Sequence, residues 1–291
     1  MRFPAEILER ARDVHSEEPS IRIRLGKVGS FGLKVPVVVG GLLTLAEADA
    51  WVSLPAGRRG VDLSRQVKAV YSLSEPPKEP EVLVRESVKL LIDLLPYADS
   101  AGVSVRFEAP LLDSRKSYRA EVSALASAES EVSGTRVELL GMTSCPCTME
   151  LIRAYMSSIG EVASLIATHT QRSLGIMEVS LRGKHPDRGK LALIIERAMS
   201  SPLMTLTRRP DEASLVMSSL RNPKLAEDVV REMVLLFLRE FPSVPDEATL
   251  LAAVRSLESV HAHDIYAEVR STVGELRAEL LDQLGEDLPN G

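Results

Sequence analysis

The chain of 291 residues carries a net charge of -6, and 45% of its residues are hydrophobic and 26% are charged. This length accommodates one large domain or two domains of ordinary size, and the composition excludes a disordered chain. The acidic balance argues against nucleic acid as a partner, and without an apolar run of about 18 residues the chain offers no candidate membrane span.

The N-terminal residues 1–10 carry acids where a signal peptide needs an apolar core, so we expect a cytoplasmic protein with reduced thiols. Alternating apolar residues predict strands, and apolar residues at helical spacing predict helices. The elements expected next are a short amphipathic helix or arm over 1–17, strands over 20–25, 33–40 and 46–54, a turn flanked by Gly29 and Gly32, a polar loop over 57–65, a helix over 80–97, and a hairpin of strands 102–108 and 116–124 around Asp113-Ser114.

The later part of the chain repeats this plan of strands, helices and strands. Its expected elements are a strand over 135–141, a helix of about twenty residues, a strand over 171–181, helices over 187–199 and 223–240, the latter capped by Asn222-Pro223, strands over 248–259 and 263–271, and a helix over 273–285. The pattern predicts an α+β protein of two modules. The first, 1–130, includes the N-terminal arm, and the second, 131–291, carries most of the chemically distinctive motifs.

Both cysteines and one of the five histidines fall within a short stretch, in Cys145-Pro-Cys147-Thr148 and Thr168-His169-Thr-Gln-Arg172-Ser. A disulfide between Cys145 and Cys147 is disfavoured because the ring is very short and proline restricts one of its torsions. A metal site or a reactive thiolate is the better chemical use of this pair. The alternative is that both cysteines are small buried hydrophobic residues.

A second cluster, Glu258-Ser-Val-His261-Ala-His263-Asp264, lies between the last two predicted strands, where packing requires no polar residues. On a strand, His261 and His263 point to the same face, so both bind one ion or one binds while the other orients a neighbour. An isolated histidine is more often an ordinary polar residue, but Glu258 and Asp264 beside this pair favour a functional site.

Two acidic stretches leave a structural and a functional interpretation open. In Arg208-Arg209-Pro-Asp211-Glu212, the acids suit the first turn of a helix that starts near Pro210, and the spacing favours this interpretation. The functional alternative is a carboxylate ligand at Glu212 and a phosphate clamp at Arg208 and Arg209. Glu227 and its neighbours are expected to begin a solvated helix face.

These motifs together resemble the metal-dependent GTP cyclohydrolases of type IB and their archaeal relatives, GTP cyclohydrolase IV. The resemblance runs from about residue 20 to residue 271, and Gly60-Val-Asp62-Leu-Ser64-Arg65 is similar to a glycine-containing motif of that family. Asp62 departs from the pattern because many members carry histidine there. The long span between Cys147 and His169 resembles the archaeal branch.

The resemblance implies the bimodular tunnelling fold, in which antiparallel-sheet modules carry helices on one face. It also implies a homo-oligomer, most often a tetramer, with active sites at subunit interfaces. The implied ligands of one divalent metal per site are one cysteine of the pair, for which we favour Cys147 over Cys145, together with Glu212 and His261. His169 is implied as a further ligand or as a residue beside the metal, and Glu258 and His263 lie around the ligands. Such a ligand set suits Fe(II), which we expect, or Zn(II) or Mn(II).

The activity implied by the resemblance is hydrolytic opening of the guanine imidazole ring of GTP with release of formate. A metal supplies a nucleophilic water at neutral pH, and His169 is the candidate to move the proton at nitrogen 7, with Cys145 and Cys147 also at the catalytic site. Arg65, Arg172, Arg208 and Arg209 are candidates to hold the triphosphate, and Glu227 to accept from the guanine edge.

We expect the 2',3'-cyclic phosphate of dihydroneopterin, the type IV product of archaeal pterin biosynthesis, because of the long Cys147-to-His169 span. The type IB product, dihydroneopterin triphosphate, is the alternative. An alternative of another class is a non-catalytic purine-binding subunit, in which the cysteines and histidines are structural.

Overall fold

The computed structural model describes residues 12–111, 116–127 and 130–284, and the chain divides into two compact units. The first unit comprises Met1–Arg106 and Val122–Val132, and the second comprises Phe107–Glu121 and Ser133–Gly291. A boundary after Val132 lies close to the predicted one at 130/131, whereas Phe107–Glu121, at the tip of a hairpin, groups with the second unit. Each unit is an antiparallel sheet with helices, so the predicted α+β class is confirmed.

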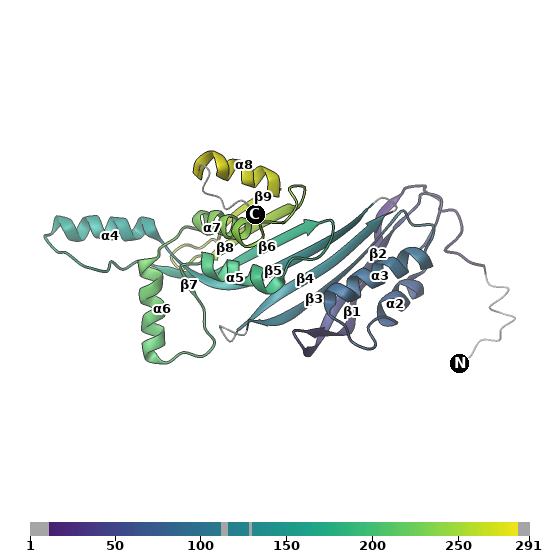
Figure 1. Cartoon of the computed structure of the whole chain (residues 1–291), viewed down its shortest axis with the longest axis horizontal. Coiled ribbons are helices and arrows are strands. Elements are labelled where there is room, and N and C mark those ends of the chain that lie inside the picture. The colour runs from purple at the N-terminus through teal and green to yellow at the C-terminus, as the bar shows by residue number, and fades with distance from the viewer. Residues whose placement is uncertain (1–11, 112–115, 128–129, 285–291) are drawn as a thin grey trace. The chain divides into compact units, whose positions relative to one another are not determined.

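The sheet of the first unit begins with a long hairpin of β1 (Leu25–Val39) and β2 (Leu42–Leu54), and β2 pairs in turn with β3 (Ser100–Leu111). Gly40 and Gly41 form the two-residue turn, and their φ angles of +57° and +82° are the left-handed values that such turns require. Helices α2 (Leu63–Tyr71) and α3 (Pro80–Leu94) lie along one face of this sheet (Figure 1).

Alternating burial explains this arrangement. Alternate residues from Val35 to Val39 in β1 and from Ala46 to Leu54 in β2 are buried against the helices, and so are apolar positions of α3. The buried set includes Val35, Val37, Ala48, Ala50, Val52, Leu83, Val84, Val88 and Leu91. The core of the first unit is therefore built from small branched side chains between one sheet face and two helices.

Four expectations for the first unit are corrected by the structure. The predicted turn between Gly29 and Gly32 is an irregularity inside β1, where the register shifts between Ser30 and Leu33. Gly29 approaches β2 so closely that an added Cβ would lie 1.9 Å from the Ala50 carbonyl oxygen, which only glycine allows. Gly32 has φ +76° and donates its N–H to Asp49 Oδ1 at 2.9 Å.

The segment predicted as a strand over 20–25 is extended but exposed, and β1 begins only at Leu25. Ile21 and Ile23 are 71% and 65% exposed, so alternation without a surface to cover it does not produce a strand. Of the arm over 1–17, residues 12–17 form turns rather than a helix, and the earlier residues lie outside the described part. The loop over 57–65 ends in helix α2, which the sequence did not predict.

In the second unit, β5 (Glu131–Ser144), β6 (Thr170–Leu181), β8 (Thr249–Leu257) and β9 (Ile265–Thr272) follow one another as antiparallel neighbours. The hairpin partner β4 (Lys116–Ser127) adjoins β5, and the two-residue strand β7 (Ser201–Pro202) pairs with the far end of β5. Asp113-Ser114, the predicted turn of the β3–β4 hairpin, lies outside the described residues.

Helices α5 (Arg188–Ala198) and α7 (Ala226–Glu240) cover one face of this sheet and bury Leu191, Ile195, Met233 and Phe237. Glycine in the strands makes room for them, because a Cβ at Gly175 would lie 2.3 Å from Ile195 Cγ2. Helix α8 (Val273–Leu284) follows β9, as predicted. None of the described helices combines the length and apolarity needed to cross a bilayer.

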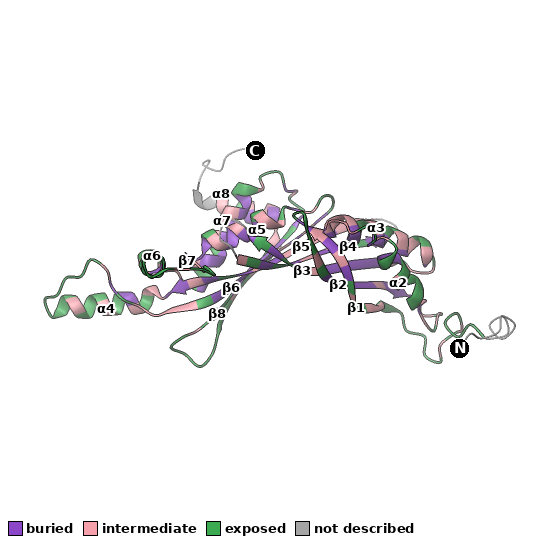
Figure 2. Ribbon diagram, turned by 90° about the horizontal axis from the view of Figure 1, so that it is seen from below, coloured by how far each residue is buried: buried purple, intermediate pink, exposed green. Residues whose placement is uncertain are grey.

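Two helices differ from the rest in exposing nearly all their residues: α4 (Pro146–Ser158) and α6 (Arg209–Arg221), whose only buried residues are Met149 and Ser219 (Figure 2). Helix α4 has 13 residues instead of the expected twenty, because the chain turns at Gly160, with φ +81°. Asn222 closes α6 rather than opening α7, which starts after Leu225 with the N–H of that residue donated to Asp228 Oδ2.

Candidate functional site

The cysteine and histidine motifs meet where β5 ends and β6 begins. Ser144 and Thr170 are the last paired residues of the two strands, and the Cys145 N–H donates to the His169 carbonyl at 3.2 Å. Thr168 Oγ1 donates to the Cys145 carbonyl at 2.7 Å, which ties the two segments together. Stretches more than twenty residues apart in sequence therefore form one edge of the second unit.

Cys145 also starts helix α4. Its Sγ accepts the Thr148 N–H at 3.5 Å as the N-cap, and Pro146 takes the first helical position, where its missing N–H has no consequence. Cys145 is half-buried and Cys147, in the first turn, is exposed. The interpretation of both thiols as buried hydrophobic residues is therefore wrong for Cys147.

A hydrogen-bonded chain orients the His169 ring. The His169 Nδ1 lies 3.0 Å from Gln171 Oε1, and Gln171 Nε2 donates to Glu258 Oε1 at 3.2 Å. An ionised carboxylate only accepts, so Glu258 determines which end of the Gln171 amide faces the ring. The amide oxygen then accepts from Nδ1–H, which leaves His169 Nε2 with its lone pair available.

The chain continues into a buried group of hydroxyls that sequence reasoning missed. Ser256 Oγ donates to Glu258 Oε1 at 2.8 Å and accepts from Ser173 Oγ at 3.2 Å, and Ser173 lies 2.8 Å from Thr143 Oγ1. All three hydroxyl residues are buried; Ser173 and Ser256 are paired across β6 and β8, and Thr143 lies diagonally opposite Ser173, two residues after its partner Gly141 on β5. The available signal was a polar residue at a buried position in each of three strands. Only the pairing of these strands shows that the three residues form one group.

The loop between β8 and β9 carries two further histidines of this unit, His261 and His263. The rings of His261 and His263 stack with centroids 5.2 Å apart, and both residues are exposed. They lie in a loop rather than on a strand, so the predicted strand alternation is not what brings them together. Ser259 Oγ lies 3.5 Å from His169 Nδ1, which places the start of this loop beside His169.

Glu212 and the two arginines before it begin helix α6. The Arg208 N–H donates to Asp211 Oδ2 at 2.9 Å and Pro210 occupies the first turn, so the helix-start interpretation is confirmed. Glu212 Oε1 accepts from Thr207 Oγ1 at 3.3 Å and remains exposed, like Arg208 and Arg209. The acids here stabilise the helix end, and the Glu212 carboxylate stays open to solvent.

The remaining predicted substrate residues belong to different elements of the two units. Glu227 is exposed in the first turn of α7, which confirms the solvated helix face. Arg65 belongs to the first unit and donates to the Leu94 carbonyl at 3.0 Å. Arg172 is exposed on β6, and its backbone is paired with that of Leu257 at the end of β8.

The four predicted metal ligands lie on separate segments of the second unit. Cys147, His169, Glu212 and His261 are all described residues, yet nowhere in the described ranges do three Cys, His, Asp or Glu side chains converge as a metal site requires. The types of donor suit a divalent metal, but their placement in a single chain does not complete a site. The ligand set stays a prediction.

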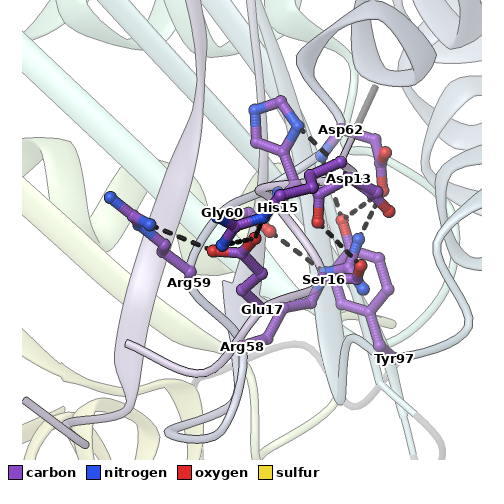
Figure 3. Close-up of polar contacts among 10 residues, drawn as sticks. Asp13, His15, Ser16, Glu17, Arg58, Arg59, Gly60, Asp62 and Tyr97 are labelled. Atoms are coloured by element: carbon purple, nitrogen blue, oxygen red, sulfur yellow. Dashed lines mark hydrogen bonds and ion pairs between the residues drawn. The ribbon is translucent and has the colours of Figure 1, made fainter. Parts of the chain in front are cut away.

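The first-unit motif around Asp62 forms a separate polar cluster (Figure 3). The Asp62 carboxylate accepts from Arg58 Nη2 at 3.0 Å and from Tyr97 Oη at 3.1 Å, and the Asp62 N–H donates to the same Tyr97 oxygen. The Arg58 guanidinium lies 3.9 Å from the centre of the Tyr97 ring. Burial raises the pKa of Tyr97, and the neighbouring carboxylate raises it further.

The segment before β1 is tied to the same loop. The Arg59 N–H donates to the Glu17 carbonyl and the Gly60 N–H to the His15 carbonyl, at 2.9 and 3.0 Å (Figure 3). The Glu17 carboxylate pairs with both Arg59 and Arg12. A Cβ at Gly60 would lie 2.6 Å from the His15 ring, which explains the glycine of this motif.

A family model described as type I GTP cyclohydrolase folE2 matches residues 11–267. The GTP cyclohydrolase MptA of Korarchaeum cryptofilum is 64% identical over 96% of this chain and 99% of the relative, and that of Thermoplasma acidophilum is 32% identical over 91% and 96%. Uricase from Arthrobacter globiformis is similar in structure, with a TM-score of 0.53 over 86% of this chain and 94% of the uricase. At 10% identity this last similarity concerns the fold alone, and it confirms the predicted tunnelling fold.

Proposed function

This chain belongs to the type I GTP cyclohydrolases described as folE2, an archaeal branch of which includes its curated relatives, and we propose that it hydrolyses GTP itself. The proposed reaction opens the imidazole ring of guanine, releases formate and gives a dihydroneopterin. The observation that carries the proposal is the 64% identity to a GTP cyclohydrolase MptA over almost the whole of both chains.

We assign the proton transfer at nitrogen 7 of guanine to His169. The hydrogen bond from Nδ1 to Gln171 leaves Nε2 free, and Gln171 is in turn held by Glu258. A ring fixed in one tautomer and one orientation is the arrangement that general acid–base catalysis needs. Gln171 and Glu258 are positioning residues in this scheme, and Glu227 is the proposed acceptor for the guanine edge.

We propose that a divalent metal, Fe(II) first and Zn(II) or Mn(II) otherwise, is bound by Cys147, Glu212 and His261, with His169 beside it. These side chains do not converge within the described residues of one chain. Their exposure is what a site completed by a second copy of the chain requires. A homotetramer with shared sites is therefore part of the proposal, and sedimentation that shows an active monomer would refute it.

The proposed product is the 2',3'-cyclic phosphate, and the alternative is the triphosphate of dihydroneopterin. Both follow from the same ring opening, and they differ in whether a ribose hydroxyl attacks the α-phosphate and displaces pyrophosphate. The relatives from Korarchaeum cryptofilum and Thermoplasma acidophilum, which match 96% and 91% of this chain, are both named GTP cyclohydrolase MptA, which favours the first product.

The test is anaerobic incubation with GTP and Fe(II), Mn(II) or Zn(II), followed by pterin fluorescence, phosphorus NMR and mass spectrometry. One pyrophosphate per pterin and a cyclic phosphate signal support the full proposal. An intact triphosphate on the pterin would refute the cyclic phosphate as the product and support dihydroneopterin triphosphate instead. Absence of any pterin with all three metals, together with retained purine binding, would establish the non-catalytic alternative.

A further inference from the structure

A cluster of three buried hydroxyls lies behind the Glu258 carboxylate, with one member on each of three neighbouring strands. Thr143 of β5, Ser173 of β6 and Ser256 of β8 are at most 2% exposed. Thr143 Oγ1 lies 2.8 Å from Ser173 Oγ and 3.5 Å from Ser256 Oγ, and the two serine oxygens are 3.2 Å apart. A buried hydroxyl adds no stability that an apolar side chain could not supply, so packing alone does not account for this hydroxyl cluster.

Each hydroxyl carries a single proton, and this fixes the direction of the hydrogen bonds. The ionised Glu258 carboxylate only accepts, so the Ser256 proton is donated to its Oε1, at 2.8 Å. Ser256 then has no proton left and accepts from Ser173, which for the same reason accepts from Thr143. All three hydroxyls of the cluster therefore donate toward Glu258.

The hydroxyl cluster and the Gln171 amide meet on one oxygen atom. Glu258 Oε1, which accepts from Ser256, also accepts from Gln171 Nε2 at 3.2 Å. Hydrogen bonds in a buried row polarise one another, so the cluster strengthens the last bond of the row and holds the carboxylate in place. The cluster therefore determines where the Gln171 amide finds its acceptor.

The orientation of the Gln171 amide selects the tautomer of His169. With Nε2 bound to Glu258, the amide presents its oxygen to His169 Nδ1 at 3.0 Å, and the ring proton resides on Nδ1. An amide turned by half a rotation would present its NH2 group instead. That orientation selects the other tautomer, in which Nε2 carries the proton and has no lone pair to offer.

Resting on the proposed function, we propose that the hydroxyl cluster positions His169 for proton transfer by holding Glu258 and, through it, the Gln171 amide. The members of the cluster are positioning residues, because they act through other side chains. Their contribution decreases with the number of hydrogen bonds that separate them from the carboxylate. Ser256 therefore contributes most and Thr143 least.

The first experiment detects the tautomer of His169 without any substrate. Solid-state NMR of the full chain with Zn(II) added and with labelled histidine ring nitrogens separates protonated from unprotonated nitrogens, and His169→Ala assigns the signals of this ring. At about pH 8 an ordinary histidine is neutral. The wild type should carry its proton on Nδ1, and Ser256→Ala should add a second set of signals with the proton on Nε2.

The matched control is Ser133→Ala, which removes another buried hydroxyl from β5. Ser133 donates to the Gly183 carbonyl at 2.7 Å and does not belong to the hydroxyl cluster. This variant should keep the wild-type signals of His169. Unchanged signals in Ser256→Ala as well would overturn the proposal.

The second experiment measures pterin formation from GTP. Ser256→Ala should lower kcat about 10-fold with KM nearly unchanged, the size expected for loss of a group that orients a functional side chain. Thr143→Val removes a hydroxyl at nearly constant volume and should lower kcat less, whereas Thr143→Ser keeps the hydroxyl and should retain the wild-type kcat. Equal losses in these two Thr143 variants, or a loss in Ser133→Ala as large as in Ser256→Ala, would reduce the cluster to a purely structural role.

A double-mutant cycle tests whether the cluster acts through Gln171. The variant that combines Ser256→Ala with Gln171→Ala should have nearly the kcat of Gln171→Ala alone, because the second change interrupts a connection that is already broken. Fully additive losses would contradict the proposed connection.

The two experiments separate this proposal from the proposed function. Absence of pterin formation by the wild type would refute the proposed activity. A changed His169 tautomer in Ser256→Ala would, in that case, still support positioning of the ring by the hydroxyl cluster. Pterin formation with unchanged kcat and unchanged tautomer in Ser256→Ala would refute the positioning role and leave the proposed function intact.

Discussion

The two units of this chain use their polar side chains differently. In the first unit, Arg58, Asp62 and Tyr97 satisfy one another, and the segment around Glu17 is tied to the same loop. In the second unit, a hydrogen-bonded chain ends on His169, while the exposed Cys147 and His261 have no hydrogen bond or ion pair with any described residue. Polar side chains that are hydrogen-bonded to one another stabilise the fold. Side chains without a partner in the protein are available to bind a ligand or to react.

The largest expected effect tests the open groups of the second unit. Replacing Glu212 or His261 with alanine should abolish pterin formation and lower the bound metal, because the ligands of one ion act together. Metal analysis of anaerobically purified protein and pterin fluorescence are the measurements. Glu247→Ala and His15→Ala, at exposed positions outside the site, are matched controls and should retain both properties. Full metal occupancy in the two ligand variants would remove these residues from the metal site.

A smaller loss of activity is expected when the residue assigned to proton transfer is replaced. His169→Ala should lower kcat by about 10²- to 10⁴-fold, the usual contribution of a general acid or base. Gln171→Ala should lower kcat less, with KM nearly unchanged, because it only orients the ring. Steady-state kinetics on both variants checks this order. A Gln171 variant as inactive as the His169 variant would contradict the positioning role.

In the first unit, removal of a hydrogen-bonding group should lower the stability of the fold without lowering kcat. Tyr97→Phe removes the oxygen that donates to the Asp62 carboxylate and accepts from the Asp62 N–H. The expected cost is about 1–2 kcal/mol, which lowers Tm by about 2–5 °C. Thermal unfolding and kcat are measured together. A large loss of kcat at unchanged Tm would show that this cluster serves catalysis after all.

The smallest effect is electrostatic and also belongs to the first unit. Hydrogen bonds from Lys34 and then Arg106 lower the pKa of Glu47 to about 2, and although burial opposes it, Arg106 and the Gly32 N–H lower the pKa of Asp49. Both carboxyls ionise more readily folded than unfolded, so their stabilisation is complete above about pH 5 and is lost as pH falls toward 2.

Arg106→Gln should therefore flatten the decline of Tm between pH 5 and pH 2. Arg197→Gln, which removes an arginine without these partners, should show the same decline as the wild type. Identical pH profiles for Arg106→Gln and the wild type would contradict the contribution of Arg106 to the lowered pKa of Glu47 and Asp49.

The sequence predicted the order of strands and helices wherever a regular spacing of apolar residues extends over many residues. Helix α3, the pair β8 and β9, and helix α8 lie close to where alternation and helical spacing place them. Predictions from the local pattern were wrong where the conformation depends on packing against another segment of the chain. Ile21 and Ile23 alternate without a surface to cover them, and Gly29 is required by the approach of Ala50 rather than by a turn.

For the site, residue types alone identified the cysteines, His169, the histidine loop and the family they resemble, because these residues are scarce and their chemistry is specific. Tertiary structure decided the rest. Pairing of β5, β6 and β8 joins Thr143, Ser173 and Ser256 into one buried group, and only this pairing shows which atom of His169 is free. The sequence determines which reactive side chains a chain contains. Which of them remain without a hydrogen-bond partner depends on the distances between side chains, and these are fixed only when strands distant in sequence pair in register.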